Sequence, residues 1–203
     1  MNRRSIKRPA PRRARRYEAR RRDILRVAAR IFRERGVAET GMRDIAEAAD
    51  LSAANLYHYF RGKDEILFYC QDRTLDRLLA SAAAARRTGR EAGTRLASVL
   101  AAHARTLLDD VEGATAHLEV GALPPLLRDR IVRKRDRYER AVRQLVTAGV
   151  TSGAFIRVDP AIVTRAMLGA LNWTVTWFRP EGATTGAQVG TAIATFLVRG
   201  ISA

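Results

Sequence analysis

The sequence predicts an all-α protein, on the basis of three observations. Ala, Arg and Leu dominate the 203 residues, which is a helix-forming composition. Apolar residues recur at steps of three and four over long stretches, and Gly and Pro stand mainly where those stretches stop. No stretch convincingly predicts a strand, and residues 154–158 have the pattern of a short extended connector. The length and a hydrophobic content of 47% allow one or two small domains with a real core.

Four helices are expected in the first part of the chain. Gly36 ends the first, and the pair Arg61-Gly62 ends the third, which Ser52 opens as N-cap. Their expected bounds are 18–35, 42–49, 52–60 and 63–85. Because the second and third are short and the fourth is long, we expect a small trihelical head joined to a larger body by the fourth helix.

Five further helical stretches follow a turn near residues 88–93. Pro and Gly clusters separate them, at bounds of about 94–111, 114–122, 126–151, 160–178 and 187–200. We therefore divide the chain into an N-terminal arm (1–17), a head (18–66) and a helical body (67–203).

Positive charge is concentrated at the N-terminus. Residues 1–22 hold eleven Arg and Lys against the single Glu18, so +10 of the total charge of +16 lies there. We interpret residues 1–17 as a basic arm that is disordered when free and that could order on DNA, with arginines in the minor groove. A pI near 11.4 favours a polyanionic partner, nucleic acid before an anionic membrane.

Several other classes of protein lack support in the sequence. No apolar stretch follows the basic run as in a secretory signal, and no run approaches the length of a membrane span. Cys70 is the one cysteine, and the three histidines lack metal-ligand spacing. We expect a cytoplasmic protein without a metal or cofactor.

Residues 43–62 have the features of a helix-turn-helix. Ala46 is small where the two helices would cross, and Asp50 tolerates the positive φ that the turn requires. Apolar anchors with suitable spacing lie behind both helices, at Ile45, Ala49, Leu51 and Leu56. In such a motif the second helix can enter the major groove of DNA.

The stretch from Leu51 to Leu67 carries an unusual density of rings. Leu56 and Phe60 would hold the third helix against the head, with Tyr59 sharing their burial, which turns Ser52, Ala53, Ala54, Asn55, Tyr57 and His58 outward. Asn55 can both donate to and accept from a base, while Tyr57, His58 and Lys63 can reach phosphates. The alternatives are packing of Tyr57 on a neighbouring helix, a solvated His58 and an ordinary surface Lys63.

The segment TGMRDIAEAADLSAANLYHYFRGKDEIL resembles the DNA-binding signature of the tetracycline-repressor (TetR) family. The resemblance covers about residues 21–67. It implies a three-helix head before a ligand-binding, dimerising body of about six helices, the last two of which pair with their copies. It also implies DNA contacts, direct or supporting, from Thr40, Arg43, Ser52, Asn55, Tyr57, His58, Tyr59 and Lys63.

The chain departs from that signature at three positions. Asp50 replaces the usual turn glycine, and Ala54 replaces a second glycine early in the third helix. Gly41 stands where the family has Ser or Thr, so we expect no capping box with Asp44. These changes leave the outward face of the third helix in place.

The segments KRDRYERAVRQLVTAGVTSGAF (134–155) and GALNWTVTWFRPEG (169–182) resemble the branch of the family that senses acyl-CoA thioesters. Trp173 and Trp177 would wall an acyl pocket, and arginines such as Arg133 and Arg137 on the 128–143 helix would bind the CoA phosphates. The alternatives are tryptophans in a core or dimer interface and a solvated Arg-rich face. His103, His117 and Glu119 could point into a cavity or be structural.

The function expected is that of a dimeric, ligand-responsive repressor, released from a palindromic operator by a small apolar effector such as an acyl-CoA. The last two helices are charge-poor and suit the dimer interface. One alternative is an architectural DNA binder that uses the basic arm. An acyl-CoA enzyme is the other, but the sequence shows no nucleophile–base pair, paired carboxylates or Gly-rich phosphate loop.

Overall fold

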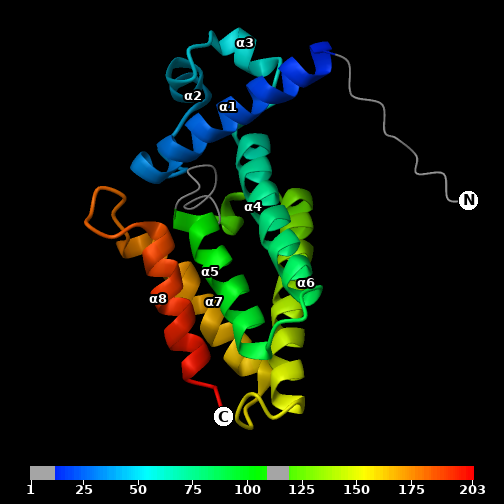
Figure 1. Cartoon of the computed structure of the whole chain (residues 1–203). Helices are drawn as coiled ribbons and strands as arrows, with labels where there is room; N and C mark the ends of the chain where they lie inside the picture. Colours follow the sequence, from blue (N-terminus) through cyan, green and yellow to red (C-terminus); the bar gives the residue numbers. More distant parts are fainter. Residues whose placement is uncertain (1–11, 109–118) are drawn as a thin grey trace, which may run out of the picture.

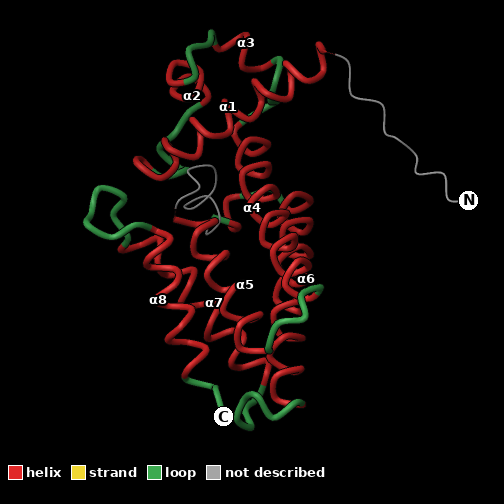
Figure 2. Tube along the Cα trace, viewed as in Figure 1, coloured by secondary structure: helices red, strands yellow, loops and turns green. Residues whose placement is uncertain are grey.

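The structure is a computed structural model that describes residues 12–108 and 119–203. These residues form helices and loops without a β-strand, as the sequence predicts; the nearest approach to a strand is an isolated bridge between Phe155 and Ser202 (Figures 1 and 2). The helices in chain order are α1 Arg12–Arg35, α2 Met42–Ala48, α3 Ala53–Tyr57, α4 Lys63–Arg86, α5 Ala92–Leu108, the 3₁₀ helix η1 Val120–Ala122, α6 Pro125–Thr151, α7 Pro160–Trp177 and α8 Gly186–Arg199.

The head consists of α1, α2 and α3 at one end of the molecule (Figure 1). Its core is formed by apolar side chains that recur at helical spacing on each of the three helices. The fully buried members include Ile24, Ala28, Phe32, Ile45 and Leu56. Because α2 and α3 are too short to be stable alone, burial of these side chains against α1 holds the two helices in place.

Helix α4 belongs to both parts of the molecule. It packs against α1 in the head and against α5 and α6 in the body (Figure 1). Cys70 is buried at the head end of α4, where its thiol donates to the carbonyl oxygen of Leu25, 3.7 Å away. Helix α4 therefore connects the body to the base of the head.

The body is built around α5, which packs against α4, α6, α7 and α8. The close crossing of α5 and α8 requires Gly190, because a Cβ there would lie 2.8 Å from the Cβ of Ala104. Gly149 leaves room for the ring of Phe155, because a Cβ there would clash with that ring. None of the helices described is long and apolar enough to cross a membrane.

Three expected helices have clearly different bounds in the structure. Helix α3 spans Ala53–Tyr57 instead of 52–60. Helix α1 begins at Arg12 instead of Glu18, so the expected arm contributes residues 12–17 to the helix. The reason is that this segment consists of good helix formers, with no breaker after Pro11. Of the expected 114–122 helix, residues 119–122 contain only η1, and 114–118 lie outside the described residues, as does the end of the expected 94–111 helix.

Candidate functional site

The helix-turn-helix is formed by α2, a tight turn and α3. Asp50 in the turn adopts φ of 53°, as the sequence predicts for this position. The guanidinium of Arg20 on α1 donates to the carbonyl oxygens of Ala49 and Asp50, at 2.9 and 3.4 Å. The first helix thereby fastens the turn, and the orientation of α3 is maintained although the turn lacks a glycine.

Helix α3 presents its polar face to solvent. Ser52 caps the helix, its Oγ accepting from the backbone N–H of Asn55 at 3.2 Å. Leu56 and Phe60 are buried, whereas Asn55 and His58 are exposed and Tyr57 is 54% exposed. Ser52 and Ala54 are exposed too and Ala53 is half-buried, so small side chains surround Asn55 at the start of the helix.

Rings and an arginine join α3 to α1 and α4. The ring of Tyr59 stacks on that of Tyr17, with centroids 5.1 Å apart. The guanidinium of Arg21 lies over the rings of Phe60 and Tyr69, 4.7 and 4.5 Å from their centroids. The rings of this stretch therefore have two roles. Tyr59 and Phe60 fix the helix, whereas Tyr57 and His58 remain available on the surface.

Two of the residues expected to contact DNA have their side chains occupied inside the head. Thr40 is buried, and its hydroxyl donates to the carbonyl oxygen of Gly36 at 2.7 Å. The ammonium of Lys63 donates to the carbonyl oxygens of Val37 and Ala38, at 2.7 and 3.2 Å. Both brace the loop between α1 and α2, whereas the sequence suggested that the ammonium of Lys63 faces a phosphate.

The start of α2 also differs from expectation. Arg43 is exposed on its first turn, as a phosphate contact requires. The carboxylate of Asp44 accepts from the backbone N–H of Gly41 at 2.7 Å. One half of a capping box therefore forms, although we expected none, because this half needs no side chain at the N-cap position.

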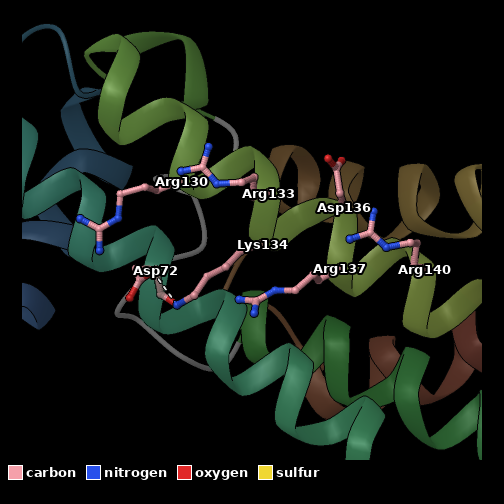
Figure 3. Close-up of a pocket in the computed structure, with 7 residues that line it drawn as sticks. All are labelled: Asp72, Arg130, Arg133, Lys134, Asp136, Arg137 and Arg140. Atoms are coloured by element: carbon pink, nitrogen blue, oxygen red, sulfur yellow. Dashed lines mark hydrogen bonds and ion pairs between the residues drawn. The ribbon is translucent and has the colours of Figure 1, made fainter.

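A basic groove runs along α6 on the outside of the body (Figure 3). It has a volume of about 580 Å³ and is lined by Asp72 of α4 and, on α6, by Arg130, Arg133, Lys134, Asp136, Arg137 and Arg140. Lys134 forms ion pairs with Asp72 and Asp76, at 2.5 and 2.7 Å. The four arginines are exposed, so their charges are available to an anion.

A smaller inner cavity lies between α4, α5, α6 and α7. Its volume is about 150 Å³, and its lining is Leu75, His103, Arg135, Asp136, Tyr138, Glu139, Leu168 and Asn172. Asp136 lines both this cavity and the basic groove, which places the two side by side. Sequence reasoning identified His103 as a candidate but missed Tyr138 and Asn172, because no local pattern connects them.

His103 is the centre of a hydrogen-bonded triad in the inner cavity, in which His103 and Tyr138 are buried and Asn172 is half-buried. Its Nδ1 lies 3.1 Å from the hydroxyl of Tyr138 and its Nε2 lies 3.1 Å from Oδ1 of Asn172. Burial lowers the pKa of His103 to about 4, against the opposing effect of the Asn172 hydrogen bond and with a further decrease from the charge of Arg135. The imidazole is therefore neutral at pH 7. Burial also raises the pKa of Tyr138 and lowers that of Arg135.

The two tryptophans lie away from both the groove and the inner cavity. Trp173 is 67% exposed and Trp177 is 48% exposed, on the outer face of α7. Neither tryptophan lines the groove that holds Arg133 and Arg137, whereas the sequence interpretation places all four around the same ligand. Glu119 is exposed, and His117 lies outside the described residues.

A junction cavity of about 400 Å³ lies where α6 meets the base of the head. Arg130 lines this cavity as well as the basic groove, and its guanidinium lies 4.5 Å from the ring centroid of Phe68 on α4. In the described part of the chain, no group of His, Cys, Asp and Glu has a geometry that could hold a metal ion.

Two family models match the chain. Residues 24–70 match the model described as bacterial regulatory proteins of the tetR family. Residues 89–201, more than half of the chain, match the model described as a tetracyclin repressor-like C-terminal domain. The two matches fall on the head and on the body.

Individual relatives agree with the family models. The TetR family regulator PfmR of Thermus thermophilus is 34% identical, with a TM-score of 0.80 over 87% of this chain and 97% of that one. The HTH-type transcriptional repressor KstR2 of Mycobacterium tuberculosis is 28% identical over 91% of this chain and 94% of its own. The structure of AibR with isovaleryl coenzyme A and operator DNA shares the fold, with a TM-score of 0.75 at 24% identity over 88% of this chain and 98% of that one.

The helix-turn-helix head, the helical body and these matches lead to one conclusion. The chain belongs to the TetR family of bacterial regulatory proteins, which are DNA-binding transcription factors and not enzymes.

Proposed function

We propose that the protein is a homodimeric repressor that a CoA thioester releases from a palindromic operator. The observation that carries the effector assignment is the adjacency of a basic groove and a partly apolar inner cavity, which share Asp136. Repressors named KstR2 among the relatives support repression as the direction of control. Because its partner is the chromosome, we place the protein in the cytoplasm.

The operator contact is assigned to α3. Asn55 is the proposed base-reading residue, with Ser52 and Ala53 allowing close approach, and Arg43, Tyr57 and His58 reach phosphates. Two copies of α3 in a dimer would sit about 34–36 Å apart, or a multiple of that distance, on adjacent major grooves. Thr40 and Lys63 support this surface from behind by fixing the loop before α2.

The dimer interface is assigned to the outer faces of α7 and α8. Ile162, Trp173 and Phe196 are 64%, 67% and 77% exposed in the single chain, which is a large apolar surface for a monomer to leave in water. α8 lies on the far side of α5 from α4 (Figure 1), so pairing there leaves the basic groove open. Trp173 and Trp177 therefore fit an interface better than a pocket within one chain.

A CoA thioester combines a polyphosphate with an acyl chain. Arg133, Arg137 and their neighbours in the groove would hold the phosphates through charge-assisted hydrogen bonds, and the acyl chain would enter the inner cavity past Asp136. The AibR structure, with isovaleryl coenzyme A and operator DNA, supports the choice because it concerns a protein of the same fold. The inner cavity thus takes the role that the sequence interpretation gave to the tryptophans.

Release of DNA would pass through α4. A ligand in the groove would contact Arg130, whose guanidinium also lies over the ring of Phe68 on α4. The ring of Phe68 contacts Tyr69 at 5.3 Å between centroids, and Tyr69 contacts Phe60 at the end of α3 at 6.1 Å. Since α4 crosses from body to head, a shift there changes the spacing of the two copies of α3.

The test uses an operator selected by the protein from random-sequence DNA. Butyryl-CoA should lower operator affinity, and calorimetry should show that butyrate binds at least 100-fold more weakly, because it lacks the phosphates. Higher salt should weaken the thioester more than the acid. Equal binding of acid and thioester would refute the groove assignment. If the protein bound random-sequence DNA as tightly as the selected operator, we would conclude that it is an architectural DNA binder and not a repressor.

A further inference from the structure

The inner cavity contains more hydrogen-bonding groups than the fold requires. His103, Tyr138 and Asn172 come from three different helices and meet in a cavity whose apolar lining residues are Leu75 and Leu168. A buried polar network of this kind costs desolvation energy, and an apolar replacement of similar shape is often as stable. The network is therefore better explained by what it offers to a ligand than by what it contributes to packing.

The orientation of the triad follows from its chemistry. Oδ1 of Asn172 can only accept, so Nε2 of the neutral imidazole carries the proton and donates to it. Nδ1 then accepts from the hydroxyl of Tyr138. The remaining capacity is an N–H pair on Nδ2 of Asn172 and a lone pair on the oxygen of Tyr138. Asn172 makes no other hydrogen bond within the described residues.

Acceptor capacity lies on the same lining. Oε1 of Glu139 is buried without a hydrogen-bond partner among the described residues, while its Oε2 pairs with Arg143 at 3.7 Å. The inner cavity thus presents unused donors and unused acceptors together.

We propose that the inner cavity recognises a hydroxyl group and so selects short hydroxyacyl thioesters over unsubstituted ones. A hydroxyl both donates and accepts, so it can donate to Glu139 and accept from Asn172 at once. A carbonyl can only accept and leaves Glu139 unpaired. A carboxylate meets two carboxylates, Asp136 and Glu139, against the single Arg135 of the lining.

The size of the cavity sets the length of the acyl chain. A volume of about 150 Å³ corresponds to roughly five water-sized groups, at about 30 Å³ each. Four carbons and a hydroxyl fill that space. The inference rests on the proposed CoA effector, because the groove beside the cavity is what would hold the remainder of the molecule.

The experiment compares butyryl-CoA, acetoacetyl-CoA and each enantiomer of 3-hydroxybutyryl-CoA by calorimetry on the full chain. One enantiomer should bind at least tenfold more tightly than butyryl-CoA, and acetoacetyl-CoA should bind with intermediate affinity. The reason is that an analogue without the hydroxyl leaves the polar groups of the site without hydrogen-bond partners. Asn172→Leu should reduce that ratio to near one. Glu139→Gln should lower the ratio at least threefold.

Arg137→Gln is the matched control, since Arg137 lines the groove and not the inner cavity. It should weaken all of the thioesters by the same factor. Equal affinities for the three kinds of thioester, unchanged in Asn172→Leu, would overturn hydroxyl recognition and leave the CoA effector standing. Failure of every thioester to bind would overturn the CoA effector itself, and hydroxyl recognition with it.

Discussion

At the scale of single residues, His103 shows how burial decides a protonation state. The unfolded chain gives this imidazole a pKa near 6.5, and burial in the body lowers the pKa to about 4. The positive charge of Arg135 lowers this pKa further, because it opposes a second positive charge on the imidazole. That effect is only partial, since the carboxylates of Asp136 and Glu139 also line the cavity. A neutral His103 is thus a condition of the native packing.

This predicts a specific pH dependence of stability. Between pH 6.5 and about 4 the unfolded state binds a proton that the native state excludes, so the free energy of unfolding falls as the pH falls through this window. The full loss attributable to His103 is about 3 kcal/mol. Urea unfolding at pH 7 and pH 4 should show this loss in the wild type relative to His103→Gln. A difference that stays constant with pH would contradict it.

Asn55 and Tyr57 are the residues on which the operator assignment depends. Both are exposed, so Asn55→Ala and Tyr57→Phe should leave thermal stability unchanged. Loss of the base contact of Asn55 should cost about 1–3 kcal/mol of operator affinity, measured by fluorescence anisotropy. Ser98→Ala, on an exposed position of α5 whose hydroxyl bonds only within its own helix, is the control. Wild-type affinity in both head variants would remove α3 from the operator.

At the scale of elements, α4 is the connection through which the body can act on the head. Its Phe68 and Tyr69 lie between Arg130 of the basic groove and Phe60 of the helix-turn-helix. Arg21 of α1 covers Phe60 and Tyr69 from the other side. These contacts are continuous and involve two parts of the chain that carry different proposed functions.

Phe68→Leu tests whether this contact chain carries the signal. The variant keeps an apolar side chain in a buried site but loses the ring contacts to Arg130 and Tyr69. Operator affinity without ligand and butyryl-CoA affinity should stay within about twofold, while release of the operator by saturating butyryl-CoA weakens by about 1–2 kcal/mol. Leu78→Met, on the same helix and equally buried, should release normally. Normal release by Phe68→Leu would place the coupling elsewhere.

At the scale of the whole molecule, the exposed apolar face of α7 and α8 is the proposed dimer interface. Ala170 lies on that face between Ile162 and Trp173, and all three are exposed in the single chain. In the proposed dimer, a second copy of the chain would cover this face and supply the second α3 for an operator with two half-sites.

Ala170→Asp should convert the dimer into a monomer, as seen by analytical ultracentrifugation. The substitution places an unpaired charge in the proposed interface, at a cost of several kcal/mol, and leaves the fold of each chain intact because Ala170 is exposed. Operator affinity should fall as dimerisation is lost. Ser98→Asp, on exposed α5, should remain dimeric. A dimeric Ala170→Asp protein would move the interface to another face.

Local patterns in the sequence determined the all-α class, the helix-turn-helix and the outward face of α3. Helix periodicity and the Ser52 cap depend on neighbours within four residues, so Leu56 and Phe60 were predictable as anchors and Asn55 and Tyr57 as surface. The positive φ of Asp50 was predictable for the same reason.

The tertiary structure alone decided which helix faces meet. Lys63 reaches the loop at Val37, 26 residues away, and His103 meets Asn172 across 69 residues. The same holds for Trp173 and Trp177, which share one stripe by helical spacing but are exposed and do not line the basic groove of α6. Periodicity fixes the residues that share a face of a helix, whereas the partner of that face is set by burial of all the helices together.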